Sequence, residues 1–282
     1  KNAFTEDEVA EYRENLLATF ESEDNSEDYF GDLLVNPATA TFIDDGRLIE
    51  VTRQLLGGNP VYFGDSSAMY YTQDHNVCSF HKDNADRHDC DAPDWEGDYT
   101  VLRFGLYLQD HHRQGGGLML RARSHKSVSR YRKLEVLNEE VFGWLNGRTR
   151  YVPAEIGDLI VWNLRTTHAG MGRFIRGPIH RPVTERTQRL IPTFMQSSVA
   201  ESRVALFASY GLAGPHLDRY LSYLKTRTYM VDIWRNTPYA PELFEKFENQ
   251  RAELLDMHHE ILSDLSSGRP VGEHTHWKPL PY

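Results

Sequence analysis

The sequence predicts an α+β fold in which a jelly roll or barrel of short strands is flanked by helices at both ends of the chain. Three observations carry this prediction. The first residues follow helical apolar spacing, the middle consists of short β-branched and aromatic runs separated by turn signals, and the residues after 199 return to helical spacing. Many short strands between turns are typical of jelly rolls and barrels.

The bulk properties narrow the class of protein. The chain has 282 residues, enough for one large domain or for a domain with an appendage. Its net charge of −10 argues against a nucleic-acid partner and against an anionic membrane surface. We expect no transmembrane helix and, from the polar opening, no signal peptide. With only Cys78 and Cys90, free thiols and a cytoplasmic location are favoured over a disulfide framework.

The elements follow from local patterns. Residues 4–20 form a predicted helix that starts with a capping box at Thr5 and Glu8, and a second helix covers Asp45 to Leu56. The predicted strands lie within VYFG (61–64), AMYYTQ (68–73), YTVLRFGLYLQ (99–109), GLMLRAR (117–123), RYVPAE (150–155), DLIVWNL (158–164) and QRLIPTFMQSS (188–198). Residues 203–226 and 238–265 read as helices. The predicted organisation is a core domain, 1–199, with a helical appendage, 200–282, packed on it.

Three residues suggest a metal site. His81 and Asp83 are two positions apart, so on a strand they would share a face. His168 follows an apolar run, at the predicted end of a buried strand. Two histidines and one carboxylate with open positions form the facial triad of non-haem Fe(II) oxygenases. The other histidines are expected to be solvated or to cap the core, and NADRHD (84–89) is expected to be an exposed loop.

Five segments, in order, resemble the phytanoyl-CoA dioxygenase-like family of Fe(II)/2-oxoglutarate oxygenases, which includes ectoine hydroxylases. They are FTEDEVAEYRENLLATF, FHKD, YLQDHHRQGGGLMLRARSHK, GDLIVWNLRTTHAG and RLIPTFMQSS, within residues 4–199. The resemblance implies a double-stranded β-helix (jelly-roll, cupin-like) core and the cofactors Fe(II), 2-oxoglutarate and O2. It also implies oxidation of an unactivated C–H bond with release of succinate and CO2.

The resemblance also assigns site residues. The iron ligands match His81, Asp83 and His168. The family's last core strand begins with an arginine that pairs with the distal carboxylate of 2-oxoglutarate, which matches Arg189, with Arg186 as the alternative. Tyr70 is a further candidate contact to the cosubstrate. Because related halogenases have Ala or Gly where this chain has Asp83, hydroxylation or a similar oxidation such as desaturation or ring closure is expected.

Two departures from the family pattern bear on the substrate. An insertion, residues 171–185, places Arg189 further from the distal histidine than usual, and Arg123 replaces a glycine before Ser124-His125-Lys126. The insertion is basic in an acidic chain, and one core strand carries a cation expected to share a face with Tyr107. The candidate contacts to a small anionic substrate are therefore Arg103, Arg173, Arg176 and Arg181. Alternatively, these arginines pair with nearby acids or face water.

Two rival functions remain at this point. A cupin-like metal enzyme that does not use 2-oxoglutarate would have no arginine clamp on its last strand. A non-catalytic binding scaffold would have lost a metal ligand, whereas all three are present here. The predicted partner is a small molecule, and the oligomeric state is not predicted.

Overall fold

The computed structural model describes residues 1–22, 31–71, 80–110, 117–128, 148–170, 174–175, 181–182, 190–196 and 203–275. The strands are β1 (Pro60–Tyr71), β2 (Val101–Tyr107), β3 (Leu118–Arg121), β4 (Thr149–Tyr151), β5 (Leu159–Asn163), β6 (His168–Gly170), β7 (Phe174–Ile175), β8 (Arg181–Pro182), β9 (Arg203–Leu212) and β10 (Glu253–Leu254). The α-helices are α1 (Glu6–Ser22), α2 (Ala40–Asp44), α3 (Arg47–Leu56), α8 (Pro215–Lys225), α9 (Thr228–Asn236), α10 (Pro241–Asn249) and α11 (Met257–Ser266). Short 3-10 helices are η1 (Leu33–Val35), η2 (Pro93–Trp95), η3 (Ser124–Lys126) and η5 (Thr193–Met195).

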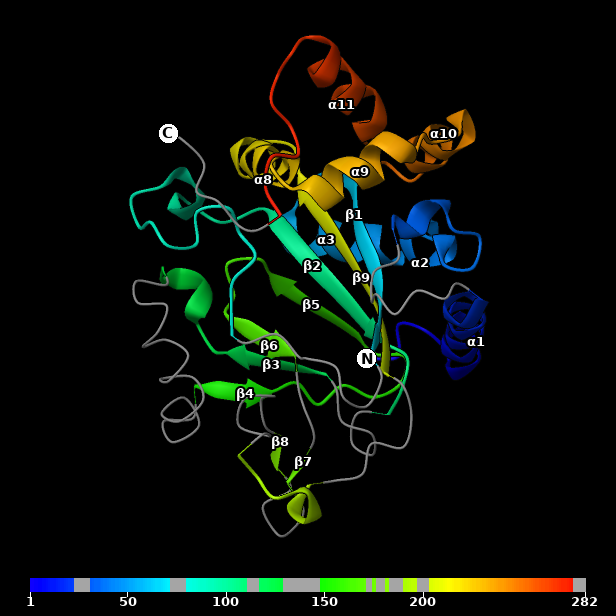
Figure 1. Cartoon of the computed structure of the whole chain (residues 1–282), viewed down its shortest axis with the longest axis vertical. Helices are drawn as coiled ribbons and strands as arrows, with labels where there is room; N and C mark the ends of the chain where they lie inside the picture. The colour runs from blue at the N-terminus through cyan, green and yellow to red at the C-terminus, as the bar shows by residue number, and fades with distance from the viewer. Residues whose placement is uncertain are drawn as a thin grey trace.

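Two sheets form the core. The main sheet has the order β10-β1-β9-β2-β5, and the minor sheet has the order β4-β3-β6 (Figure 1). His81 forms an isolated antiparallel bridge with His168, so the chain before Asp83 extends the minor sheet past β6. Among β1, β9, β2 and β5, each neighbouring pair of strands is antiparallel, and the connections cross between the two sheets. This arrangement confirms the predicted jelly-roll core flanked by helices.

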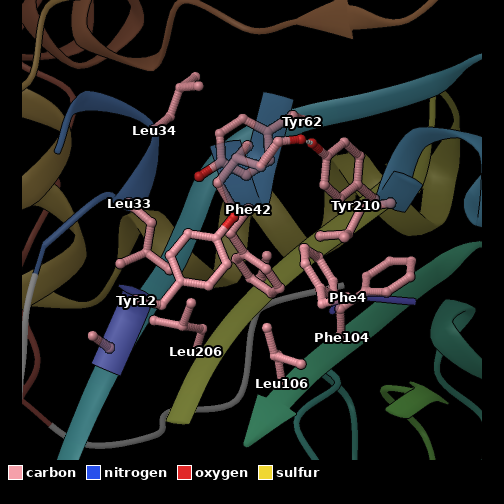
Figure 2. Close-up of a cluster of buried hydrophobic side chains, with 14 of the residues drawn as sticks. Phe4, Tyr12, Leu33, Leu34, Phe42, Tyr62, Phe104, Leu106, Leu206 and Tyr210 are labelled. Carbon is pink, nitrogen blue, oxygen red and sulfur yellow. Dashed lines mark hydrogen bonds between the residues drawn. The ribbon is translucent and has the colours of Figure 1, made fainter. Parts of the chain in front are cut away.

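The main sheet buries both faces. On one face, Phe104 of β2 and Leu206 and Tyr210 of β9 pack with Tyr12 of α1 and Phe42 of α2 (Figure 2). On the other face, Trp162 of β5, Ala205 and Phe207 pack with Leu118 of the minor sheet. The second cluster lies between the two sheets, so side chains on that inner face point towards the interior of the jelly roll.

The first helix begins where the sequence places it. The backbone N–H of Thr5 donates to Glu8 Oε2 (2.7 Å), and the Glu8 N–H donates to Thr5 Oγ1 (3.2 Å), which is the reciprocal pairing of a capping box. Arg47, the first residue of α3, donates to Glu8 (2.7 Å) and lies 3.8 Å above the ring of Phe4. The predicted helices over 4–20 and 45–56 are therefore confirmed as α1 and α3.

The strand predictions hold except near the C-terminal side of the core. The runs 61–64 and 68–73 belong to one strand, β1, whose register shifts between Tyr62 and Ser66. Residues 190–196, expected within the last core strand, contain the 3-10 helix η5 instead. The prediction of a helix over 203–226 was wrong for its first half: 203–212 is β9, the strand between β1 and β2.

The helices after β9 pack on one end of the main sheet (Figure 1). Side chains of α8, α9 and α11, including Leu221, Trp234 and Ile261, share a buried cluster with Phe63 and Val101. Two helices, α10 and α11, occupy the predicted helix 238–265, and β10 between them pairs parallel with β1. The boundary at 199/200 stays a prediction, and β9 lies on its C-terminal side. Among the described helices, none has the length and apolar character needed to cross a membrane.

Candidate metal centre

His81, Asp83 and His168 come together. His81 Nε2 lies 3.4 Å from one Asp83 carboxylate oxygen, and His168 Nε2 lies 3.3 Å from the other. One ligand atom from each residue falls within a group of atoms no more than 4.8 Å apart. The side chains of His81 and Asp83 keep 35% and 27% of their area exposed, so the group has an open side. Two imidazoles and one carboxylate suit Fe(II) and leave coordination positions for other ligands.

Backbone pairing sets this geometry. The His81 N–H donates to the carbonyl of His168 (2.9 Å), and the His168 N–H donates back to the carbonyl of His81 (2.9 Å). The Asp83 N–H donates to the carbonyl of Leu164 at the end of β5 (3.0 Å). The two ligand-bearing segments therefore form one short ladder. His168 begins β6 after a turn, whereas the sequence placed it at the end of the preceding strand.

The protonation of the site suits metal binding. His168 Nδ1 lies 3.0 Å from the carbonyl oxygen of Thr166, which can only accept, so Nδ1 carries the hydrogen and Nε2 keeps its lone pair for a metal. Burial lowers the pKa of His168 to about 4, so the imidazole is neutral at neutral pH. Burial alone would raise the pKa of Asp83, but the neighbouring His168, His81 and Arg103 hold that pKa far below its usual range.

Lys82 lies between the candidate ligands His81 and Asp83, and its buried side chain bonds the backbone that packs against them. Its side chain is 1% exposed, and its ammonium donates to the carbonyl oxygens of Ser124 (2.7 Å) and Arg165 (2.6 Å). The same nitrogen lies 5.7 Å from the ring centre of Trp95. Arg165 lies three residues before the distal histidine, so Lys82 ties the His81–Asp83 segment to the turn that precedes His168. Sequence reasoning passed over it because a lysine in a charged run is usually solvated.

Replacing Lys82 with methionine is expected to weaken metal affinity by roughly 10- to 100-fold, the effect of removing an outer group that orients metal ligands. Methionine preserves the apolar stem but cannot bond the two carbonyls. Calorimetric titration with Fe(II) under anaerobic conditions measures this, with exposed Lys126→Met as the matched control. An unchanged metal affinity in a folded Lys82→Met protein would show that Lys82 serves the fold alone.

The segment after the candidate ligands is buried over 84–86 and half-buried over 87–89, which corrects the prediction of an exposed loop over 84–89. Asn84 and Asp86 are 0% and 3% exposed. The carboxylate of Asp94 accepts from the Asn84 side chain (2.9 Å) and from the Asp86 N–H (2.9 Å). Arg219 of α8 donates twice to the Asp86 carboxylate, both at 2.8 Å. The C-terminal helices therefore hold the segment that follows Asp83.

Arg103 lies on the inner face of β2, as the sequence predicted. It donates to Ser209 Oγ (2.9 Å) and pairs with the Asp65 carboxylate (2.9 Å), which also accepts from the Tyr220 hydroxyl (3.0 Å). Asp65 is 7% exposed and lies where the register of β1 shifts, and Gly64 beside it has a φ of 71°. The buried pair offsets much of the positive charge that the sequence assigned to an anionic substrate.

The structure does not bring Tyr70 to the metal centre. Tyr70 pairs across the sheet with Val204, and both belong to the cluster on the outer face, beneath α1. The Tyr70 ring stacks on Phe20 with 5.0 Å between centroids. A residue on that face does not line the space between the sheets, so the contact of Tyr70 to the cosubstrate stays a prediction that its place in β1 does not support.

The remaining predicted arginines are not placed by the structure. Arg173, Arg176, Arg186 and Arg189 lie outside the described residues, and of Arg181 only its backbone in β8 is described. Another arginine, Arg203, begins β9 and is 8% exposed. By strand alternation it shares the inner face with Ala205 and Phe207. On that face, Trp162 has its ring centre 5.4 Å from that of His168.

Comparison with known proteins places the fold. A model of the phytanoyl-CoA dioxygenase (PhyH) family matches residues 1–173. HygX from Streptomyces hygroscopicus, solved with nickel and 2-oxoglutarate, superposes with a TM-score of 0.51 at 17% identity over 74% of this chain and 80% of that one. EctD from S. alaskensis, solved with 2-oxoglutarate and 5-hydroxyectoine, superposes with a TM-score of 0.50 at 19% identity, over 75% of this chain and 70% of that one. AviO1 from Streptomyces viridochromogenes Tue57 superposes with a TM-score of 0.50 at 16% identity, over 76% of this chain and 90% of that one. No curated protein matches the sequence.

Proposed function

Because this chain belongs to the phytanoyl-CoA dioxygenase family, whose members are Fe(II)- and 2-oxoglutarate-dependent oxygenases, we propose that it holds its iron on His81, Asp83 and His168. The convergence of these three side chains on one open point is the observation that carries the proposal. Their donor set fits Fe(II), and iron with 2-oxoglutarate supplies O2 activation coupled to release of succinate and CO2. The cupin-like and scaffold alternatives do not account for family membership together with a complete triad.

The protein's own part in the reaction is to orient and to exclude water. The hydrogen bond from His168 Nδ1 to the Thr166 carbonyl fixes the ring, and the His81–His168 backbone pair fixes the spacing of the imidazoles. Trp162 and Phe207 supply an apolar wall on the inner face. Such a wall keeps water from the reacting carbon and favours oxidation of a bound substrate over side reactions.

We assign the distal carboxylate of 2-oxoglutarate to Arg203 rather than to Arg189. The resemblance places the clamp at the start of the last core strand, and the last described strand before the C-terminal helices is β9, which begins at Arg203. Its face, shared with Phe207, supports this assignment, and its planar guanidinium suits a carboxylate. The family match ends at residue 173, before either arginine.

The substrate that this site supports is a small molecule. One structurally similar protein, HygX, has been solved with hygromycin B bound beside nickel and 2-oxoglutarate, at 18% identity, a TM-score of 0.51 and coverage of 74% of this chain and 80% of that one. Asp83 favours hydroxylation or a related oxidation of a C–H bond. An anionic substrate contacting Arg173, Arg176 or Arg181, and a cytoplasmic location, remain predictions from the sequence.

Slow formation of succinate from 2-oxoglutarate without added substrate tests this function. We expect succinate from wild type only when Fe(II) and O2 are both present, because the complete triad supports the cosubstrate half-reaction. Asp83→Ala is expected to form none above the iron-free background, whereas Asp98→Ala, a change of equal charge outside the triad, is expected to match wild type. Equal succinate from Asp83→Ala and wild type would contradict the assignment of Asp83.

A further inference from the structure

A cavity lies outside the metal centre, beside the end of β3 and the start of β4. Its volume is about 440 Å³, within the range of small-molecule sites. Two serines and four arginines line it: Ser124, Ser127, Arg121, Arg123, Arg148 and Arg150. No acidic side chain lines it among the residues that the structure describes. We call this cavity the arginine pocket.

The arginine pocket is positively charged, whereas the chain as a whole is negatively charged. The protein carries a net charge of −10, yet four guanidinium groups border one cavity. Neither Arg123 nor Arg150 forms an ion pair within the described part of the chain, and both are exposed. The positive charges of Arg123 and Arg150 border the same cavity and repel each other, and a bound anion would reduce that repulsion.

Arg123 adds a second, independent observation. Its backbone has φ 65° and ψ 9°, the left-handed conformation that favours glycine. The sequence resemblance places a glycine here, so this chain has an arginine where the backbone favours the simpler residue. Strained backbone of this kind persists at sites that clamp ligands. The residue with this backbone conformation lines the arginine pocket.

Hydrogen bonds hold Ser124 in the wall of the pocket, and a neighbouring basic cavity shares one lining residue with it. Ser124 Oγ donates to the Arg121 carbonyl (2.8 Å) and accepts from the Thr167 N–H (2.8 Å). A second cavity of about 730 Å³ shares Ser127 with the first and is lined by His125, Lys126, Arg165 and Trp95, with Asp98 as its one described acid. Burial lowers the pKa of His125, and nearby Lys126 and Arg165 lower that pKa further. Positive potential therefore extends from one cavity into the next.

We propose that the arginine pocket binds the phosphoryl or pyrophosphoryl group of a small molecule. Phosphate oxygens accept paired hydrogen bonds from several guanidinium forks at once, whereas a single carboxylate offers two oxygens and one charge. The Ser127 hydroxyl lies on the same wall, and it can donate to a bound anion in place of its long hydrogen bond to the Ser124 carbonyl (3.5 Å). The site lies outside the metal centre, so binding there requires neither iron nor 2-oxoglutarate.

The test is calorimetric titration of the metal-free full chain with inorganic pyrophosphate at low salt. Wild type is expected to bind one equivalent, and Arg123→Gly and Arg150→Gln are each expected to weaken binding by about tenfold or more. Arg235→Gln, an exposed arginine on α9, removes the same charge elsewhere and is expected to bind as wild type does. Because glycine suits the backbone at position 123, Arg123→Gly is expected to keep or raise the melting temperature, so its loss of binding is not loss of fold.

The outcomes separate the sources of the anion. A pyrophosphate monoester that binds tighter than inorganic pyrophosphate assigns the group to a larger molecule, and equal affinity assigns it to the free anion. Both results keep the proposal. It is overturned if wild type does not bind pyrophosphate, or if Arg235→Gln weakens binding as much as the two pocket variants do, since that pattern reports net charge alone.

Discussion

Replacing His168 with alanine is expected to lower the affinity for Fe(II) by at least about 100-fold, because loss of an outer orienting group already costs about 10- to 100-fold and we propose His168 as a ligand itself. Asp83 would then keep only one imidazole beside it. The change removes a side chain with 8% exposure, so melting temperature and circular dichroism are measured in parallel. Anaerobic calorimetry with Fe(II) gives the affinity.

His259→Ala, an exposed histidine on α11, is the matched control for this measurement and should bind Fe(II) as wild type does. If His168→Ala kept the wild-type affinity while folded, the metal would have to lie elsewhere. Among the described residues, the other grouping of possible ligands is the exposed set Asp89, Cys90 and Asp91. That set would then become the site to test.

Replacing Arg203 with glutamine is expected to raise the dissociation constant of 2-oxoglutarate by roughly 10- to 100-fold, which corresponds to loss of charge-assisted hydrogen bonds to one carboxylate. Fe(II) affinity should stay near the wild-type value, because Arg203 lies on the main sheet while His81 and His168 pair in the minor one. Arg203→Lys should recover only part of the loss, since an ammonium cannot form the two parallel bonds.

The same titration distinguishes the candidate clamps. Arg189→Gln and Arg186→Gln are expected to bind 2-oxoglutarate as wild type does, and so is Tyr70→Phe, whose ring lies on the outer face of the sheet. If Arg189→Gln weakened 2-oxoglutarate binding while Arg203→Gln did not, the result would support Arg189, the clamp assigned from the sequence, and would contradict the assignment of Arg203.

The sequence was sufficient to find the three candidate ligands because each carries a local signal. His81 and Asp83 stand two positions apart, and His168 follows an apolar run that forms β5. The ladder that joins them, with His81 bonded to His168 and Asp83 to Leu164, connects residues more than 80 positions apart in the chain. No local pattern reports such a pairing, so the sequence predicted the three residues as candidate ligands but not the ladder that joins them.

The strand β9 was missed for a physical reason. It is buried on both faces between β1 and β2, so its run RVALFASYGL lacks the alternation that marks a half-buried strand. A mostly apolar run of ten residues is equally consistent with a buried helix. The position of β9 matters for the site, because our proposal for the 2-oxoglutarate clamp follows the start of the last strand before the C-terminal helices, which lies at Arg203 and not at Arg189.

Tyr70 and Lys82 show what else lies beyond local patterns. The register shift in β1 between Tyr62 and Ser66 decides which residues face inward. The alternation of apolar and polar residues in the sequence does not predict the length of that shift. Lys82 alternates away from the two ligands on either side of it, but its burial depends on the carbonyls of Ser124 and Arg165. Tertiary packing sets both the orientation of Tyr70 and the burial of Lys82. It also brings Arg219 of the C-terminal helices to the Asp86 carboxylate.

Anaerobic titration of the metal-free protein with Fe(II) and then 2-oxoglutarate, followed by visible absorption, tests the central claim most directly. The account predicts a weak charge-transfer band that saturates at one 2-oxoglutarate per chain, is absent in His168→Ala and requires far more 2-oxoglutarate in Arg203→Gln. Iron binding to wild type without any such band would contradict it and would point to a cupin-like metal enzyme that does not use 2-oxoglutarate.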